Sequence, residues 1–321
     1  MGTVANTGTA EAATPPPVVA APPGRASADR AATRAAVLFL APALLLIGLF
    51  FFLPVAAALV LSLTDFDLYA VGDLENTRWV GLRNYAQLLQ TPLFWGALRN
   101  TFYFALVGGP LSIAASLGAA LLLDSKLVRF KGFFRTVYFA PFVTTLVAVA
   151  IVWRYLYHSR YGLINWMLAK AGIAPIDWLG DPDWAMPAII LMAVWKNFGY
   201  NMLIFIAGLQ SIPRELYEAA EIDGASWWRR FWHVTLPMLG PTLLFVGVIT
   251  MIGYFQLFAE PYVMTQGGPL RSTTSVVLLM YEEGFRWWRM GYAAAVAFVL
   301  FVVILAATLL QYRVQREREA R

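Results

Sequence analysis

The chain has 321 residues, of which 60% are hydrophobic, 13% are charged and none is cysteine. Soluble domains carry about 25% charged residues, so this composition excludes a soluble protein and predicts an all-α integral membrane protein. Disulfides and cysteine metal sites are excluded, and the net charge of +5 does not indicate nucleic-acid binding, because the basic residues flank apolar segments instead of forming one patch.

The first predicted segment is a tail over residues 1–34. It is rich in Ala, Pro and Thr, includes the run Pro15–Pro17, and cannot bury enough apolar surface to offset the entropy of ordering. We expect a disordered cytoplasmic tail here. A second, short cytoplasmic tail is expected over the charged residues 313–321.

Six apolar runs lie between these tails. Each is long enough to cross a hydrocarbon core about 30 Å thick at about 1.5 Å per residue, which predicts a six-helix membrane domain over 35–312 with a core over 96–312. The runs lie near residues 36–63, 97–123, 134–157, 185–210, 233–258 and 290–311.

The basic residues predict the orientation of these spans. With the N-terminus in the cytoplasm, fourteen Lys and Arg residues fall in inner segments and eight in outer segments. Because cytoplasmic loops are enriched in Lys and Arg, both termini are expected inside. The same arrangement places the connection 211–241 in the cytoplasm.

The sequence contains no catalytic constellation. None of the four lysines follows a glycine, so there is no Walker A loop to bind ATP phosphates, and no GxSxG elbow occurs. His158 and His233 fall on opposite sides of the predicted membrane, which excludes a histidine metal pair. We therefore predict no enzyme activity, no metal and no cofactor.

Several residues of the connection 211–241 favour particular caps, turns and helix breaks. Ser211 is a candidate N-cap, Gly224 permits a sharp turn, and Ser226 can cap a second helix. Pro237 and Pro241 are expected to break the helix where the fifth span begins. Such chemistry predicts contact with another protein. The alternative is a helix that rests on the inner leaflet, with Trp227 and Trp228 as interfacial anchors.

Eight residues of this connection resemble the EAA loop of permease subunits of binding-protein-dependent ABC importers. In that family the loop forms a short cytoplasmic coupling helix that docks into a groove of the ATPase subunit. The resemblance implies this ATPase-coupling role for Glu218, Ala219, Ala220, Asp223, Gly224, Ala225, Leu236 and Pro237.

The resemblance extends over roughly residues 36–315, through Trp195–Pro213, Met264–Pro269 and Gly291–Ala295, and points to the maltose and glycerol-3-phosphate branch. It implies a type I importer permease fold in a bacterial inner membrane. The implied partners are a second homologous permease, two ABC ATPase subunits that bind the ATP, and an extracytoplasmic substrate-binding protein. The implied cargo is a sugar or oligosaccharide, with glycerol-3-phosphate or another polyol as the alternative.

Polar residues in the fourth span are candidates for the substrate path. Lys196, Asn197 and Asn201 interrupt this span, and the two asparagines share a helix face. Asparagine suits sugar hydroxyls because its amide both donates and accepts hydrogen bonds. An equally weighted alternative is that Lys196 is structural and is satisfied by carbonyl groups of a neighbouring helix.

Tyr254, Gln256 and Glu260, near the outer end of the fifth span, are further candidates for this path. Aromatic residues at such a position are more often interfacial belt anchors, and that interpretation is favoured here. Gly267 and Gly268 predict a tight turn beyond the span.

Two other classes of function are weighed against an importer. An ion-coupled secondary transporter would favour acidic residues inside the membrane, and no Asp or Glu lies within spans one to four or six. A membrane anchor or assembly subunit without a ligand would not need the EAA-like residues.

Overall fold

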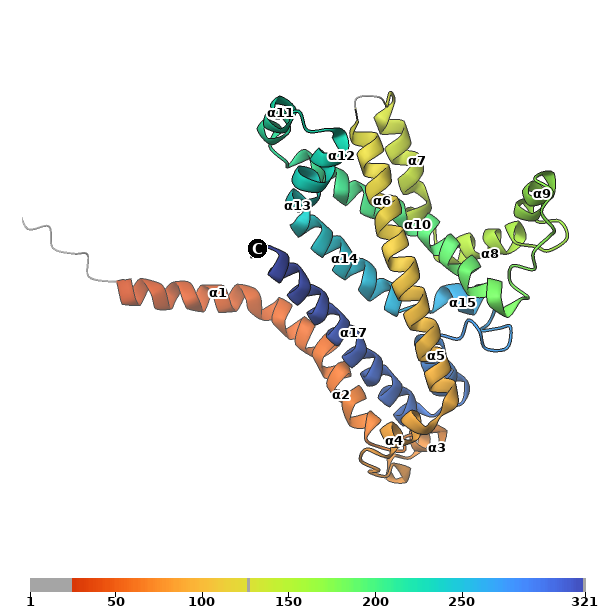
Figure 1. Ribbon diagram of the computed structural model, residues 1–321. Coiled ribbons are helices and arrows are strands. Elements are labelled where there is room, and N and C mark those ends of the chain that lie inside the picture. The colour runs from red at the N-terminus through yellow and green to blue at the C-terminus, as the bar shows by residue number, and fades with distance from the viewer. Residues whose placement is uncertain (1–24, 126–127, 320–321) are drawn as a thin grey trace, which may run out of the picture. The chain divides into compact units, whose positions relative to one another are not determined.

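A computed structural model describes residues 25–125 and 128–319 (Figure 1). Over these residues the chain is helical and contains no strand, apart from one isolated bridge between Thr64 and Trp79. The predicted all-α fold class is therefore confirmed.

The α-helices, in chain order, are α1 (Arg25–Ile47), α2 (Leu53–Ser62), α3 (Leu68–Gly72), α4 (Arg83–Gln90), α5 (Pro92–Tyr103), α6 (Gly109–Asp124), α7 (Lys131–Val143), α8 (Leu146–Leu156), α9 (Leu163–Lys170), α10 (Pro182–Gln210), α11 (Arg214–Ile222), α12 (Trp227–Arg230), α13 (Leu236–Met238), α14 (Gly240–Phe255), α15 (Ala259–Met264), α16 (Val276–Tyr281) and α17 (Met290–Glu319). Wider or tighter helical turns join some of them: the π-helical turns η1 (Gly48–Phe52), η3 (Phe104–Gly108), η4 (Phe231–Thr235) and η5 (Glu282–Arg286), and the 3-10 turn η2 (Leu74–Asn76).

Four helical segments of the described chain are long and apolar enough to cross a membrane unbroken: Ala35–Ser62, Pro92–Asp124, Pro182–Gln210 and Met290–Val314. They correspond to the first, second, fourth and sixth predicted spans. The third and fifth are bent pairs, so the number of spans reaches six when each pair counts as one.

The third predicted span is broken between α7 and α8, which meet at 99°. Pro141 lacks an N–H for the helix ladder, and the Thr144 hydroxyl donates to the Ala140 carbonyl at 3.1 Å. Thr144 then takes an extended conformation. The apolar run continues through this point, so hydropathy alone does not predict the break.

The fifth predicted span is bent by 69° at Leu239, between Trp227–Met238 and α14. Pro237 and Pro241 flank the bend, as expected from their sequence positions. Only the part from Gly240 to Phe255 forms a straight apolar helix.

The chain divides into two compact units, Met1–Ala56 and Ala57–Arg321. In the first, α1 begins at Arg25, inside the segment 1–34 for which a disordered tail is predicted. Residues 25–36 are rich in alanine and arginine, which favour helix. The rest of that predicted tail, residues 1–24, lies outside the described residues.

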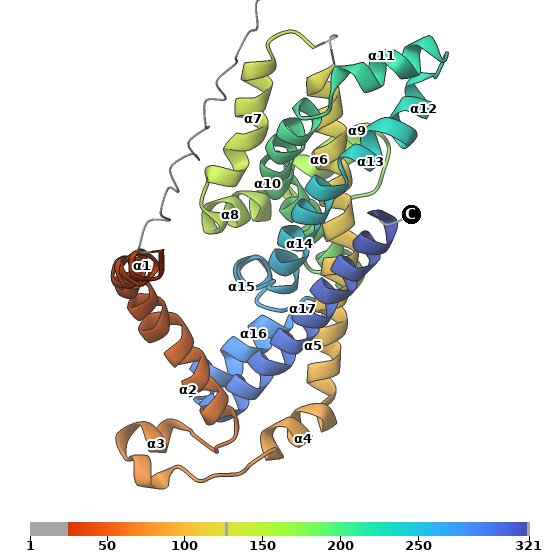
Figure 2. The same cartoon turned by 90° about the vertical axis from the view of Figure 1, so that its left-hand side faces the viewer.

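In the second unit α10 is the central helix, and its most extensive packing is against α6 and α7 (Figure 2). Gly199 allows the approach to α7: a Cβ added there would overlap the Tyr138 carbonyl and lie 2.6 Å from its carbon. Since backbone cannot move aside as a side chain can, this helix pair depends on the glycine.

The two ends of the second unit carry different structures. α11 and α12 lie at the same end as the last turn of α6 and the first turn of α7, whereas α3 and α4 lie at the opposite end (Figures 1 and 2). α17 continues as a helix to Glu319, through most of the second predicted tail.

Candidate functional site

A pocket with a volume of about 400 Å³ and a mostly apolar lining lies between α10 and α14. This is within the range of about 300–1,000 Å³ that is usual for small-molecule sites. Four of the six residues predicted for the substrate path line it. The lining residues are Phe104, Phe142, Asn197, Tyr200, Asn201, Ile249, Thr250, Gly253, Tyr254 and Glu260.

The two asparagines of α10 lie on the pocket wall, as their spacing predicts. Asn201 is buried, and its amide donates to the Thr250 hydroxyl of α14 at 2.9 Å. Asn197 is half-buried and donates to the Ala193 carbonyl of its own helix at 2.9 Å. The asparagines therefore bring amide groups to an otherwise apolar helix interface.

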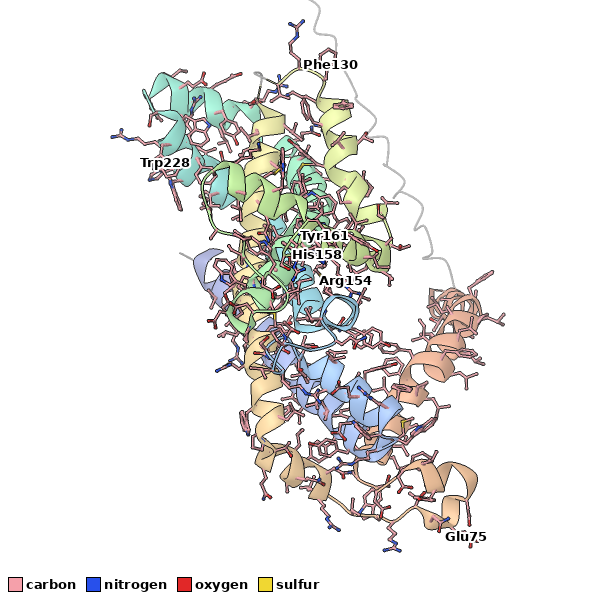
Figure 3. All side chains as sticks on the ribbon, turned by 90° about the vertical axis from the view of Figure 1, so that its right-hand side faces the viewer. Glu75, Phe130, Arg154, His158, Tyr161 and Trp228 are labelled. Carbon is pink, nitrogen blue, oxygen red and sulfur yellow. The ribbon has the colours of Figure 1, made fainter. Side chains whose placement is uncertain are left out.

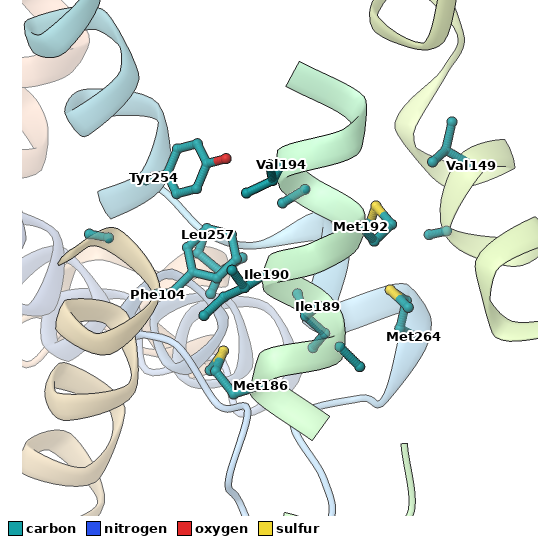
Figure 4. Packing of buried hydrophobic residues seen from close by; sticks show 14 of the residues in the cluster. Phe104, Val149, Met186, Ile189, Ile190, Met192, Val194, Tyr254, Leu257 and Met264 are labelled. Atoms are coloured by element: carbon teal, nitrogen blue, oxygen red, sulfur yellow. The ribbon is translucent and has the colours of Figure 1, made fainter. Parts of the chain in front are cut away.

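Tyr254 reaches the pocket from α14, and its ring points toward α10 (Figure 4). It is only 5% exposed and stacks on Phe104 with ring centroids 4.9 Å apart. Gly108 makes room for this ring, because a Cβ there would lie 2.6 Å from it. The favoured interpretation of Tyr254 as an interfacial belt anchor is wrong, since a belt anchor faces the lipid.

An aromatic pair contributes a second wall of the pocket. Phe142 of α7 and Tyr200 of α10 stack with centroids 4.5 Å apart and ring planes within 14°. Neither residue is among the predicted site residues. Tyr200 lies three positions after Asn197, so helix spacing is a sequence signal that could have found it. Phe142 belongs to α7 and lies 58 positions before Tyr200 in the sequence, so no local pattern indicates it.

Lys196 does not line the pocket. It is 8% exposed, and its ammonium donates to the carbonyl oxygens of Phe142 at 3.2 Å and Pro141 at 3.5 Å. These carbonyls belong to the last turn of α7, where a helix lacks its own donors. These contacts agree with the alternative stated above, in which Lys196 is a structural residue whose ammonium group is satisfied by carbonyl groups of a neighbouring helix.

Replacing Lys196 by methionine is expected to lower the stability of the α7–α10 contact by about 1 kcal/mol, because two partly buried carbonyl groups at the end of α7 lose their donor. Uptake per folded transporter should persist, since the pocket wall is unchanged. Thermal unfolding in detergent, combined with uptake in proteoliposomes, separates the two effects. Lys196→Arg, which retains a donor, is the control. If Lys196→Met had normal stability but no uptake, Lys196 would again be a candidate for the substrate path.

Of the two remaining candidates for the substrate path, one lines the pocket and the other does not. Glu260, in the first turn of α15, lines the pocket, whereas Gln256 ends α14 with an exposed side chain and does not. Among the pocket's lining residues, Glu260 is the one that carries a carboxylate, and none carries a lysine or arginine.

The EAA-like residues form an exposed helical hairpin at one end of the unit. α11 ends at Ile222, and Gly224 follows with φ of +71°. The Ala225 N–H donates to the Ala220 carbonyl and the Gly224 N–H to the Glu221 carbonyl, which is the Schellman arrangement that a left-handed glycine permits. The predicted turn at Gly224 is confirmed.

The caps of the hairpin differ partly from expectation. The Ser226 side chain caps α12 by accepting from the Arg229 N–H, as predicted. Ser211 is not the N-cap of α11, because it terminates α10 and its hydroxyl donates back to the Gly208 carbonyl. Pro213 occupies the N-cap position instead.

Two side-chain links join α11 to the segment that leads into α14. The Tyr217 and Thr235 hydroxyls are 3.0 Å apart, and Glu221 forms an ion pair with Arg230. Glu218, Ala219, Asp223, Gly224 and Pro237 are exposed, and Ala220, Ala225 and Leu236 are half-buried. The matched residues thus present a surface with little contact to the rest of the unit.

The turn predicted at Gly267 and Gly268 is present, with φ of +83° at Gly267. Thr274 and Thr273 donate from their hydroxyls to the Gly267 and Gly268 carbonyls. Asn100 of α5 donates to the carbonyls of Arg271 and Thr274, at 3.0 and 3.1 Å. Asn100 was not predicted, because its partners lie more than 170 positions along the chain.

His158 and His233 lie in separate parts of the unit. His158 stacks on Tyr161, and Figure 3 shows both beside Arg154 and apart from Trp228. His233 belongs to η4, which directly follows the α12 helix that carries Trp228. In the described part of the chain, no group of three or more His, Cys, Asp or Glu residues could hold a metal ion.

Known proteins similar to this chain are transport permeases. Residues 113–319 match the family described as binding-protein-dependent transport system inner membrane component. The lactose transport system permease protein LacF of Rhizobium radiobacter is 40% identical over 286 residues, covering 88% of this chain and 94% of LacF. The sn-glycerol-3-phosphate transport system permease protein UgpA of Agrobacterium fabrum is 34% identical over 282 residues, covering 87% and 93%.

A solved structure shares the fold. A chain of a bacterial ABC transporter involved in the import of the acidic polysaccharide alginate superposes with a TM-score of 0.74 at 24% identity, covering 92% of this chain and 99% of that chain. The sequence matches extend over most of the chain and concern transport proteins, not enzymes. This chain is a multi-pass membrane permease that belongs to the family of binding-protein-dependent transport system inner membrane components.

Proposed function

We propose that the chain is one permease subunit of an ATP-driven importer and forms half of the translocation path for a sugar or oligosaccharide. A second homologous permease completes the path, and two ATPase subunits bind at the cytoplasmic side, one of them at α11 of this chain. An extracytoplasmic binding protein delivers the cargo. The complex lies in a bacterial inner membrane with both termini of this chain in the cytoplasm.

The observation that carries this proposal is the exposed hairpin with its EAA-like residues. α11 has no buried residue, and Tyr217 and Glu221 supply its described side-chain links to the segment before α14. A polar helix with so few contacts gains little stability from the rest of its unit. Contact with a partner protein therefore explains best why α11 carries the EAA-like residues. Movement of that partner on binding ATP would bias the permease between two states.

The named relatives support a carbohydrate cargo and a binding protein. They include permeases of arabinooligosaccharide and trehalose/maltose transport systems, from Bacillus subtilis and Thermococcus litoralis. The alginate transporter with the similar fold has also been solved in complex with an alginate pentasaccharide-bound periplasmic protein. Transfer of these properties to the present chain is part of the proposal.

The pocket favours an uncharged cargo over glycerol-3-phosphate. Amide and hydroxyl groups of Asn197, Asn201 and Thr250 suit sugar hydroxyls, and the Phe142–Tyr200 pair offers aromatic faces. A phosphate would require a basic group, but Lys196 is committed to the carbonyls of α7. Glu260 on the pocket wall would repel an anion.

Replacing Asn201 by leucine is expected to reduce uptake by about ten-fold or more, because a polar contact to the cargo and the link to Thr250 are both lost, and about 1.4 kcal/mol corresponds to ten-fold. Uptake of radiolabelled sugars by the complete transporter is the measurement. Gln256→Leu, outside the pocket, should leave uptake unchanged. Normal uptake by the Asn201 variant would exclude this pocket from the path.

A further inference from the structure

Four aromatic rings of the second half of the hairpin form a continuous array, which we call the ring array: Trp227, Trp228, Phe231 and Trp232. Trp227 stacks on Phe231 with centroids 5.9 Å apart, and Trp228 lies 5.7 Å from Phe231 and 5.8 Å from Trp232. The tryptophans are between 49% and 60% exposed. A contiguous exposed patch of this kind indicates a contact outside the described chain.

The direction of the segment that carries the ring array is set by the fifth span. Residues Trp227–Met238 are bent by 69° from the axis of α14. Membrane helices tilt by about 20° on average from the bilayer normal, so a segment bent this far from α14 runs closer to the membrane plane than to the normal. It also joins the span directly at Leu239, which keeps it near the membrane surface.

The charges of this segment match a membrane surface. From Ala225 to Pro241 the chain contains Arg229, Arg230 and His233, and no Asp or Glu. Arg230 pairs with Glu221 of α11, whereas Arg229 is exposed and is the cation available to the membrane surface. Tryptophan and basic residues together are typical of the lipid–water boundary, where the rings lie among the headgroups and the cations meet lipid phosphates. α11 differs, since it carries Glu215, Glu218 and Glu221 and no tryptophan.

We propose that the ring array lies in the lipid–water boundary at the membrane surface where the fifth span begins, with phospholipid headgroups as its partner. The two halves of the hairpin then face different partners. α11 projects from the surface and is free to bind a protein, while the segment after Gly224 is fixed in the boundary, at a depth of about 5–10 Å. This placement does not depend on the proposed coupling to an ATPase.

Depth measurement with nitroxide labels tests the placement. The chain has no cysteine, so single-cysteine variants can be made without first removing any. Labels at Trp228 and Trp232 would be compared in lipid nanodiscs with a control at Ile222, which is 86% exposed on α11, and a control at Phe245, which is 53% exposed within the apolar helix α14. ATPase subunits are left out.

We expect collisions with a water-soluble nickel chelate to be several-fold fewer at Trp228 and Trp232 than at Ile222, and collisions with oxygen to be more frequent. Both values should fall between those at Ile222 and at Phe245. Nickel accessibility equal to that of Ile222 at both positions would overturn the proposal.

A second measurement keeps all four rings in place. A fluorophore attached at Arg229→Cys should be quenched strongly by lipids that carry a nitroxide on the headgroup, and less by lipids labelled deep in the acyl chain. If neither of the two lipids quenched the fluorophore, the proposal would be contradicted. Shielding of this site that arises only when ATPase subunits are added would contradict it too, and would assign the ring array to a protein interface.

Discussion

Replacing Gly224 by valine is expected to reduce ATP-driven uptake and the binding of the ATPase subunits together. Gly224 has φ of +71°, a conformation that costs L-residues about 1–2 kcal/mol and β-branched residues more. Nothing lies within 4 Å of the added Cβ, so the effect comes from the backbone and not from crowding. Strain at this turn would break the Schellman hydrogen bonds that end α11 and change the direction of the helix.

The expected size of the Gly224→Val effect follows from how lightly α11 is held. A strain of about 1–3 kcal/mol corresponds to roughly five-fold to more than a hundred-fold in an equilibrium, and α11 has few contacts to resist it. Uptake driven by ATP should therefore fall by about ten-fold or more. Binding of the ATPase subunits to the variant, measured by co-purification, should weaken in parallel.

Gly224→Asn is the matched control, because asparagine tolerates the left-handed conformation better than other residues with a Cβ. It should retain most of the uptake. Insertion and monodispersity of both variants should equal those of the parent chain, since the hairpin is exposed. If Gly224→Val supported normal uptake and normal ATPase binding, the proposed coupling role of this hairpin would fail.

Replacing Gly199 by alanine is expected to have the largest effect on folding. The added Cβ would overlap the Tyr138 carbonyl of α7, so α7 and α10 could pack only after moving apart. Overpacking costs about 1–3 kcal/mol even where side chains can adjust, and here the obstacle is backbone. Separation would also pull Lys196 from its carbonyl partners and Phe142 from Tyr200.

The measurement for Gly199→Ala is the temperature at which half of the purified protein loses monodispersity in detergent, and a decrease of many degrees is expected. Gly118→Ala is the control, since Gly118 also lies in a helix, α6, but its added Cβ meets nothing within 4 Å. There alanine should be neutral or stabilise by about 0.5–1 kcal/mol. Equal behaviour of the two variants would show that α7 does not depend on contact with Gly199.

Much of this fold follows from local patterns in the sequence. Hydropathy finds the unbroken spans because each apolar run is as long as the bilayer is thick. The turn at Gly224 and the cap at Ser226 follow from residues that act on their own neighbours. The EAA-like residues are likewise contiguous enough to be recognised as a set.

What the sequence does not predict depends on contacts between distant segments. The break after α7 falls inside an uninterrupted apolar run, and its position is supported by Lys196, which lies 54 positions beyond Phe142. Tyr254 resembles a belt anchor until η3 supplies Phe104 and Gly108 beside it. Asn197 and Asn201 were predicted together because a helix repeats locally, but the Phe142 wall of their pocket requires the packing of α7 against α10.

The contact between Lys196 and the end of α7 also bears on the order of biogenesis. An unpaired lysine at mid-membrane depth costs roughly 2.5–3.5 kcal/mol on insertion scales. The carbonyl groups that accept its hydrogen bonds precede it in the chain and are therefore synthesised before α10. A chain in which α7 entered the bilayer later than α10 would leave the Lys196 ammonium group unpaired among lipid tails.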